Sequence, residues 1–493
     1  MISPLFCLIL LPVFGAIFAF ANVAPRRVSQ ISAVTTLLAT LAVAASYARN
    51  VFLDPAGRGE YLFVSQWSVL PDWGLNFTLG VDGLAVAMLV LSALVLVGAI
   101  WFSPKQIDRA GLFYGNVLLI AAGAIGAFAS LDVFFFYAFH ELALIPTFLL
   151  IGIWGSGDRQ AAAWKATVYL ATGSFILLLG IIGLYLSCPE NSRTFDMRGL
   201  SQLAESGALQ PNAVVYVFLV LGFGILVSLF PFHTWAPPAY AAAPTPAAML
   251  HSGVLKKFGL YGLMRIVTPL FPPGVTEPWD NLLLALLVGN ILFVGFVTVA
   301  QKRLDWMLGN ASVMHMGYMF LGIASGTALG LNGAAMLLFA HGLSIAVLFA
   351  IAGEIRDRTG TLDMEQLGGL AKKAPLMGLL FGFGAMAAVG LPGFANFVGE
   401  VMVFFGSFGR SNPDSSFWPS NFQIATIAAV WGMVISAIYL LRAYRKIFFG
   451  ELPARWNAIR DLTLSARLVV VLLLAALMIV GFYPKALTSL LNF

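Results

Sequence analysis

Five ionisable residues stand inside long apolar runs of the sequence: Glu141, Lys257, His315, His341 and Glu400. On insertion scales a charge at the centre of a bilayer costs about 2.5 to 3.5 kcal/mol, so such residues invite a functional explanation. Carboxyl, ammonium and imidazole groups in one row can pass a proton along, because burial brings carboxyl and ammonium pKa values toward neutrality. We therefore expect these five side chains to form a proton relay. The alternative is that each is a structural polar group, such as a histidine that donates to a carbonyl.

The composition places these residues in a membrane protein. Of the 493 residues, 60% are apolar and 10% are charged, and the mean hydropathy is +0.90. Soluble domains carry about 25% charged residues, so the sequence excludes a soluble globular protein, a nucleic-acid-binding protein and a disordered chain. Two cysteines, Cys7 and Cys188, are too few for a disulfide framework, an iron–sulfur cluster or a structural zinc site. We therefore expect neither a metal nor a cofactor on this chain.

Apolar runs of about 20 residues predict fourteen membrane-spanning helices and hence an all-α fold. The predicted spans lie near residues 2–22, 30–50, 82–102, 111–130, 132–153, 163–186, 212–231, 247–269, 281–301, 306–326, 329–353, 375–408, 423–447 and 466–490. When successive spans alternate in direction, most Lys and Arg residues fall in the loops on one side of the membrane. Because cytoplasmic loops carry this excess, we expect both chain termini to lie on the outer side.

Proline and glycine interrupt two of these spans. The seventh runs into FPFHTWAPP, which contains Pro231, and the twelfth contains GLPG around Pro392. Proline removes a helical hydrogen bond and clashes with the preceding turn, so we expect helices 7 and 12 to be broken. Two breaks five spans apart predict two inverted five-helix repeats, a pattern typical of transporters. The predicted organisation is a single membrane domain, 1–493, with helices 1–3 in 1–110, the repeats in 111–269 (helices 4–8) and 281–447 (helices 9–13), and helix 14 in 466–490.

Several long motifs make the chain similar to a known family. The similarity is carried by FHELALIPTFLLIGIWG, FPFHTWAPPAYAAAPTPAAMLHSGVLKKFGLYGLMR, VMHMGYMFLG, AHGLSIAVLF, GLPGFANFVGEVMVFFGSF and LRAYRKIFFG. Over about residues 80–450 the chain resembles the antiporter-like membrane subunits of respiratory complex I, most closely subunit M. The resemblance implies fourteen helices with broken helices 7 and 12. It also implies a proton pathway, whose residues in helices 5, 8, 10, 11 and 12 match Glu141, Lys257, His315, His341 and Glu400.

Three positions depart from the family pattern. Leu226 stands where the seventh-helix lysine is usual, so Glu141 lacks its expected partner. The usual WLPDAH reads WAPPAY at 235–240, and the usual basic stretch that enters helix 10 reads LDWM at 304–307. Three hypotheses follow from the missing lysine. Lys256 substitutes from another face of its helix, since adjacent side chains point about 100° apart; the first half-channel is closed; or the chain is a paralogue with different coupling or a different ion.

The resemblance implies a proton-translocating subunit of a complex I-type NADH:quinone oxidoreductase, in which other chains carry the electrons. NADH, FMN, iron–sulfur clusters and quinone would then bind partner subunits, because this chain lacks a glycine-rich dinucleotide loop and cluster ligands. The expected partners are L-, N- and K-like subunits, the peripheral redox arm and lipid, but no nucleic acid. Alternative functions are a subunit of a cation/proton antiporter, an energy-converting hydrogenase or a bicarbonate-uptake complex, or a structural role in assembly. We expect a multi-pass protein of the bacterial plasma (inner) membrane.

Overall fold

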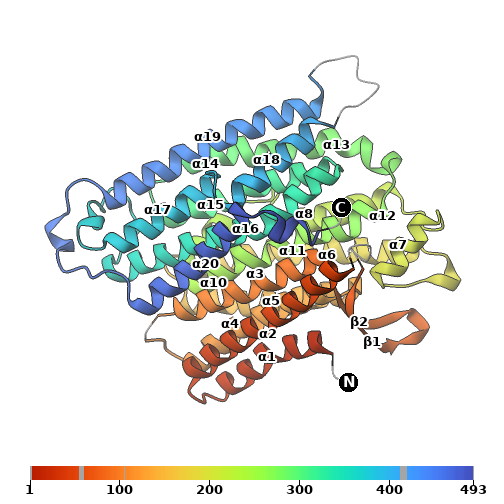
Figure 1. Ribbon diagram of the computed structural model, residues 1–493, viewed down its shortest axis with the longest axis horizontal. Helices are drawn as coiled ribbons and strands as arrows, with labels where there is room; N and C mark the ends of the chain where they lie inside the picture. The colour runs from red at the N-terminus through yellow and green to blue at the C-terminus, as the bar shows by residue number, and fades with distance from the viewer. Residues whose placement is uncertain (1–2, 55–59, 105, 411–418, 492–493) are drawn as a thin grey trace.

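The computed structural model describes residues 3–54, 60–104, 106–410 and 419–491. The chain is mostly helical, and its long helices run side by side, with α1 (Pro4–Phe20) at one edge and α19 (Asn421–Phe448) at the opposite edge (Figure 1). The other helices are, in chain order, α2 (Pro25–Leu53), α3 (Gly83–Trp101), α4 (Ala110–Ala129), α5 (Val133–Trp154), α6 (Arg159–Leu186), α7 (Met197–Glu205), α8 (Ala213–Val227), α9 (Ala236–Ala242), α10 (Thr245–Leu250), α11 (Lys257–Gly262), α12 (Thr268–Leu270), α13 (Pro273–Val288), α14 (Val294–Ala300), α15 (Leu304–Ala324), α16 (Ala328–Thr359), α17 (Pro375–Val389), α18 (Ala395–Phe408), α20 (Leu464–Phe482) and α21 (Lys485–Thr488).

The helices differ in how far the rest of the chain covers them. Among the described residues, nine helices are long and apolar enough to cross a membrane. The central ones are α16 and α3, whose most apolar 18-residue windows are 100% and 94% buried, whereas the window of α2 is only 33% buried. The open face of α2 carries exposed apolar side chains such as Ile31 and Leu38. Whole helix faces of this kind suit contact with lipid, and the prediction of a mostly helical membrane fold is confirmed.

Both predicted helix interruptions are present. α8 ends at Val227, Ser228 has a left-handed backbone with φ 72°, and the helix resumes only with α9. α17 ends at Val389, Gly390 has φ 81°, and α18 follows after a short non-helical segment. Glycine adopts a positive φ without the steric penalty of a side chain, so the second interruption has a built-in turn residue.

The predicted span 247–269 is not one regular helix. It consists of α10, α11 and α12, joined by the π-helical turns η4 (His251–Leu255) and η5 (Leu263–Val267). A third π-helical turn, η6 (Gly289–Phe293), separates α13 from α14. Such turns change the phase of a helix and are frequent at functional sites. η4 ends directly before Lys256 and Lys257, so it sets the direction of both side chains.

The all-α prediction missed one two-stranded sheet. β1 (Leu62–Leu70) and β2 (Leu75–Val81) form an antiparallel hairpin that leads into α3. The paired residues Trp67 and Phe77 stack with ring centroids 5.4 Å apart. The strands are joined by a short 3-10 turn (η2, Pro71–Trp73) and by Gly74, whose φ is 63°. A PDWG turn between two segments of alternating polarity is the sequence signal that indicates this hairpin.

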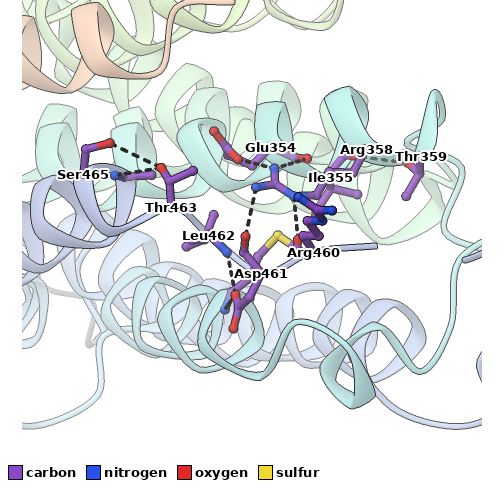
Figure 2. Close-up of polar contacts among 11 residues, drawn as sticks. Glu354, Ile355, Arg358, Thr359, Arg460, Asp461, Leu462, Thr463 and Ser465 are labelled. Carbon is purple, nitrogen blue, oxygen red and sulfur yellow. Dashed lines mark hydrogen bonds and ion pairs between the residues drawn. The ribbon is translucent and has the colours of Figure 1, made fainter. Parts of the chain in front are cut away.

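The loop between α19 and α20 holds the first turn of α17. Asp461 accepts the backbone N–H groups of Leu376 and Met377 at 2.9 and 3.0 Å and so caps α17 from a distant segment. Figure 2 shows the loop beside α16, where Arg358 donates to the carbonyl oxygen of Arg460 at 2.8 Å. A carboxylate at a helix N-terminus satisfies free N–H groups and suits the helix dipole. These contacts tie α16, α17 and the start of α20 together at one end of the molecule.

Candidate functional site

Lys257, His341 and His315 form a buried row of neighbouring side chains. Nζ of Lys257 is 3.0 Å from Nδ1 of His341, and the rings of His341 and His315 have centroids 5.3 Å apart. Lys257 also donates to the backbone carbonyl of Ser252, in η4, at 2.6 Å. None of these three residues is more than 4% exposed. Three of the five predicted site residues thus come together, brought by α11, α16 and α15.

His315 meets a carbonyl oxygen at each ring nitrogen. Nδ1 lies 2.8 Å from the oxygen of Ala311, and Nε2 lies 2.9 Å from the oxygen of Ala388. A neutral imidazole has one N–H and can donate to only one of these oxygens, whereas an imidazolium can donate to both. Either charge state can therefore occupy this site. The neutral ring makes one of the two hydrogen bonds, and the protonated ring makes both.

Lys256 faces a different set of groups from the lysine that follows it. Its Nζ lies 3.4 Å from Oγ of Ser312 and 5.5 Å from the ring centroid of Tyr240. The hydroxyl of Tyr240 is in turn 3.2 Å from Nδ1 of His251. A cation is attracted to an aromatic face, most strongly where water is excluded, and Lys256 is fully buried. Ser312 precedes His315 by one turn of α15, so Lys256 approaches the helix that carries this histidine.

Glu400 lies at the second helix break, apart from the row of Lys257, His341 and His315. The residue is 1% exposed, and its carboxylate lies against Gly390, where an added Cβ would collide with Oε2. Among the described residues, Oε2 of Glu400 has no hydrogen-bond partner. Ala388, whose oxygen faces His315, lies two residues before Gly390. The turn at Gly390 therefore lies between Glu400 and the end of the histidine row.

Glu141 is separated from the two lysines. Ser174 donates to its Oε1, and Nδ1 of His140 lies 3.4 Å from the same oxygen. In the described part of the chain, neither Lys256 nor Lys257 is a hydrogen-bond or ion-pair partner of Glu141. Its side chain is 34% exposed, in a groove of about 260 Å³ between α5 and α6. The burial expected for Glu141 is thus incomplete, because α5 turns this face toward the periphery of the chain.

Leu226 is buried next to the segment that holds Glu141. It is 3% exposed and packs on α6, where a Cβ added to Gly173 would lie 3.4 Å from Cδ2 of Leu226. Gly173 immediately precedes Ser174, the hydroxyl partner of Glu141. The aliphatic side chain therefore occupies the neighbourhood in which the resemblance implies a lysine.

Besides His251, two buried histidines lie outside the predicted set of site residues. His140 is 4% exposed and precedes Glu141, while His233 is 7% exposed and lies between α8 and α9. Nδ1 of His233 has no partner among the described residues, and the charges of Lys256 and Lys165 act on its ring. Lys165 lines a cavity of about 490 Å³ beside the loop that joins α5 to α6. A histidine inside an apolar run, as in FHELAL and FPFHTW, is the signal that indicates both.

The chemistry of these groups is that of proton carriers. Carboxyl, ammonium and imidazole side chains each bind and release a proton at an atom described above. In the parts of the chain that the structure describes, no group of three or more His, Cys, Asp or Glu residues could hold a metal ion.

Comparison with known proteins identifies the family. The family model described as NADH:quinone oxidoreductase/Mrp antiporter, transmembrane, matches residues 130–417. Chain 4 of the NAD(P)H-quinone oxidoreductase of a Picosynechococcus species is 35% identical over 437 residues, covering 88% of this chain and 80% of that protein. Subunit M of the F(420)H(2) dehydrogenase of Methanosarcina mazei is 33% identical over 464 residues, covering 92% and 90%.

Solved structures agree with the sequence comparison. A chain of respiratory complex I from Thermus thermophilus superposes with a TM-score of 0.86 at 28% identity, covering 98% of this chain and 97% of that one. A chain of the Mrp complex from a Dietzia species has the same fold, with a TM-score of 0.83 at 22% identity, covering 99% and 96%. The chain therefore belongs to the NADH:quinone oxidoreductase/Mrp antiporter family of transmembrane proteins, as an antiporter-like subunit of the complex I type.

Proposed function

We propose that this chain is a proton-translocating subunit of a complex I-type NADH:quinone oxidoreductase. The observation that carries the proposal is the buried row Lys257–His341–His315, in which each side chain lies beside the next. Relatives that share a third of the sequence are named as subunits of an NAD(P)H-quinone oxidoreductase and of an F(420)H(2) dehydrogenase. Electrons then pass through partner chains, and this chain provides a route for protons.

We propose that protons pass along this row in the order of its residues. The ammonium of Lys257 gives a proton to Nδ1 of His341, which leaves a neutral amine and an imidazolium. The ring of His315 is the next acceptor, and its Nε2 faces Ala388 at the end of α17. Glu400 lies on the other side of the turn that follows α17, and its carboxyl group is the next proton acceptor after His315. Each step exchanges one N–H or O–H bond for another and needs no change in oxidation state.

Lys256 supplies a second connection to the same helix. Through Ser312 it approaches α15 one turn before His315, and it lies over the ring of Tyr240. This position supports a part for Lys256 in the relay, although Lys256 does not contact Glu141 as the lysine absent at Leu226 would be expected to do. The hypothesis fails if Lys256→Ala leaves proton pumping intact.

The rest of the proposal concerns the membrane. Fourteen spans in two inverted five-helix repeats, with both termini outside, would include the nine long helices and the shorter apolar helices α1, α8, α17 and α18. L-, N- and K-like subunits and a peripheral arm with NADH, FMN, iron–sulfur clusters and quinone would complete the assembly. The complex I-like fold supports membership in such an assembly. We place the complex in the bacterial plasma membrane.

Inverted membrane vesicles that contain the intact complex provide the test. NADH-driven acidification of the vesicles and NADH oxidation are measured together in the wild type and in His341→Gln and Glu141→Gln. We expect acidification per NADH to fall about tenfold in His341→Gln, because the acceptor of Lys257 is lost. Unchanged acidification in both variants would refute the relay. Purification of the chain with small membrane partners alone, without flavin- and iron–sulfur-bearing chains, would instead favour a cation/proton antiporter.

A further inference from the structure

His140 is a buried titratable residue that the relay described above does not use. It lies on α5 directly before Glu141 and is 4% exposed. Its Nδ1 is 3.4 Å from Oε1 of Glu141, and Ser174 donates to the same oxygen. The Glu141 carboxylate therefore has one hydroxyl and one imidazole as neighbours. Of these two, only the imidazole can exchange a proton near neutral pH.

Aromatic stacking fixes the ring of His140. The ring lies nearly parallel to that of Phe258, with centroids 4.0 Å apart and an interplanar angle of 23°. Phe136, one turn earlier on α5, also stacks on Phe258, with centroids 4.0 Å apart and an angle of 16°. Phe258 directly follows Lys257 in α11. The imidazole is thus held between Glu141 and the segment that carries Lys257.

Further contacts lead from His140 toward the interior. α5 packs on the π-helical turn η4, which begins with His251. Nδ1 of His251 is 3.2 Å from the hydroxyl of Tyr240, and the ring of Tyr240 lies 5.5 Å from Nζ of Lys256. Titratable groups therefore follow one another from Glu141 inward although position 226 is leucine.

We propose that His140 exchanges protons with Glu141 and links this carboxyl to the buried lysines, in place of a lysine at position 226. This inference rests on the proposed function and deepens it. In the transfer step, the His140 imidazolium gives its Nδ1 proton to the Glu141 carboxylate. One N–H bond breaks and one O–H bond forms, which leaves a neutral imidazole and a carboxylic acid. A proton from the lysine side then restores the imidazolium.

The placement of both groups on α5 has a mechanical consequence. A partner on another helix could separate from Glu141 when the two helices shift, whereas His140 moves together with it. The connection that can open is instead the one between the His140 ring and the α11 segment. Movement of α5 against Phe258 would therefore connect Glu141 to the interior relay or disconnect it.

A chemical label on Glu141 tests this inference independently of transport. A lipophilic carbodiimide reacts with protonated carboxyl groups, and the groove between α5 and α6 gives it access to Glu141. Membranes with the intact complex are labelled over a range of pH, and the Glu141 peptide is quantified by mass spectrometry. Glu141→Gln identifies the background. His140→Phe keeps a ring for the stack but removes both nitrogens, and His140→Gln keeps a hydrogen-bonding group without a titratable one.

Phe136→Leu is the matched control, because it removes a ring from the same stack without touching Glu141. We expect half-maximal labelling to move up by about one pH unit in His140→Phe and to stay within a few tenths of a unit in Phe136→Leu. NADH-driven acidification should fall about tenfold in both His140 variants. An unchanged labelling midpoint in His140→Phe, or an equal shift in Phe136→Leu, would overturn the role of His140. If the midpoint shifts but Glu141→Gln pumps normally, Glu141 and His140 interact but do not belong to the relay, and the inference fails together with that part of the proposed function.

Discussion

Replacement of Lys257 by methionine separates the chemical role of the lysine from its structural role. Methionine matches the length of the lysine stem, so the change leaves little cavity. It removes two polar contacts, to the carbonyl of Ser252 at 2.6 Å and to Nδ1 of His341 at 3.0 Å. It also removes an ammonium group from a site that is 0% exposed. The expected result is a protein that is folded but does not pump.

The magnitudes explain why stability and activity should diverge. Hydrogen bonds of a charged group contribute about 1.5 to 3 kcal/mol each, so the loss of two would destabilise the chain by roughly 3 to 6 kcal/mol. Removal of a buried ammonium offsets this by about 3 kcal/mol on insertion scales, and methionine adds apolar contacts with the surrounding side chains. The net change in the free energy of unfolding should therefore stay below about 3 kcal/mol.

The assay combines two measurements on the same membranes. Thermal unfolding of the solubilised complex reports stability, and acidification per NADH in inverted vesicles reports translocation. Lys373→Met, which removes an exposed lysine, controls for the change in net charge. Full acidification in Lys257→Met would refute the relay through His341. A loss of stability well above 5 kcal/mol would show instead that Lys257 is a structural anchor.

Three further changes have definite expected outcomes. Gly390→Ala places a Cβ at φ 81° and against the Glu400 carboxylate, so it should cost about 1 to 2 kcal/mol and lower acidification; normal values of both would contradict the account of this turn. Asp461→Ala removes the carboxylate that accepts two backbone N–H groups at the start of α17, and it should lower the free energy of unfolding by about 1 to 2 kcal/mol. Asp461→Asn should lower it less, and denaturation experiments measure both changes. Burial raises the pKa of Asp132, which precedes α5, from 3.8 to about 7. As the pH rises, Asp132 loses its proton in the unfolded chain before it does so in the folded one. The free energy of unfolding should therefore fall by roughly 4 kcal/mol between about pH 4 and about pH 7 and then level off. Asp132→Asn should abolish this pH dependence.

The interruptions of the helices could be predicted because their signals are local. Pro231 and Pro392 lack a backbone donor in any context, and each break lies within a few residues of one of them. The mostly helical membrane fold follows in the same way from the length and apolar character of the runs. The hairpin was missed for the opposite reason, since its short strands compete with a strong pattern of long apolar helices.

The contacts of the site depend on packing that no local pattern encodes. Lys257 and His341 are 84 residues apart and meet because α11 and α16 lie beside each other in the centre of the molecule. The side chains of Lys256 and Lys257 point to different groups just after the π-helical turn η4. Such a turn shifts the helical positions of the residues that follow, and the hydropathy of the sequence does not reveal it. The exposure of Glu141 depends on which face of α5 its neighbours cover.

The side chains of Asn290 and Trp235 bind backbone groups that the first helix break leaves free. The side chain of Asn290, from η6, accepts the N–H of Phe230 at 2.7 Å and donates to the carbonyl of Ser228 at 3.0 Å. Nε1 of Trp235 donates to the carbonyl of Ile225 at 3.1 Å. Neighbouring helices thus satisfy the freed backbone groups, as the apolar surroundings of a membrane require.

At the second break, a titratable side chain binds the carbonyl oxygen that is left free, and the sequence explains why this oxygen is free. The oxygen of Ala388 would bind the N–H four residues later in a continuous helix, but that residue is Pro392, which has none. Nε2 of His315 lies 2.9 Å from this free oxygen. A proton on Nε2 makes the hydrogen bond and its loss removes the donor, so we expect the protonation of this histidine to affect the end of α17. We therefore expect this contact to couple the protonation of His315 to the position of the second broken helix.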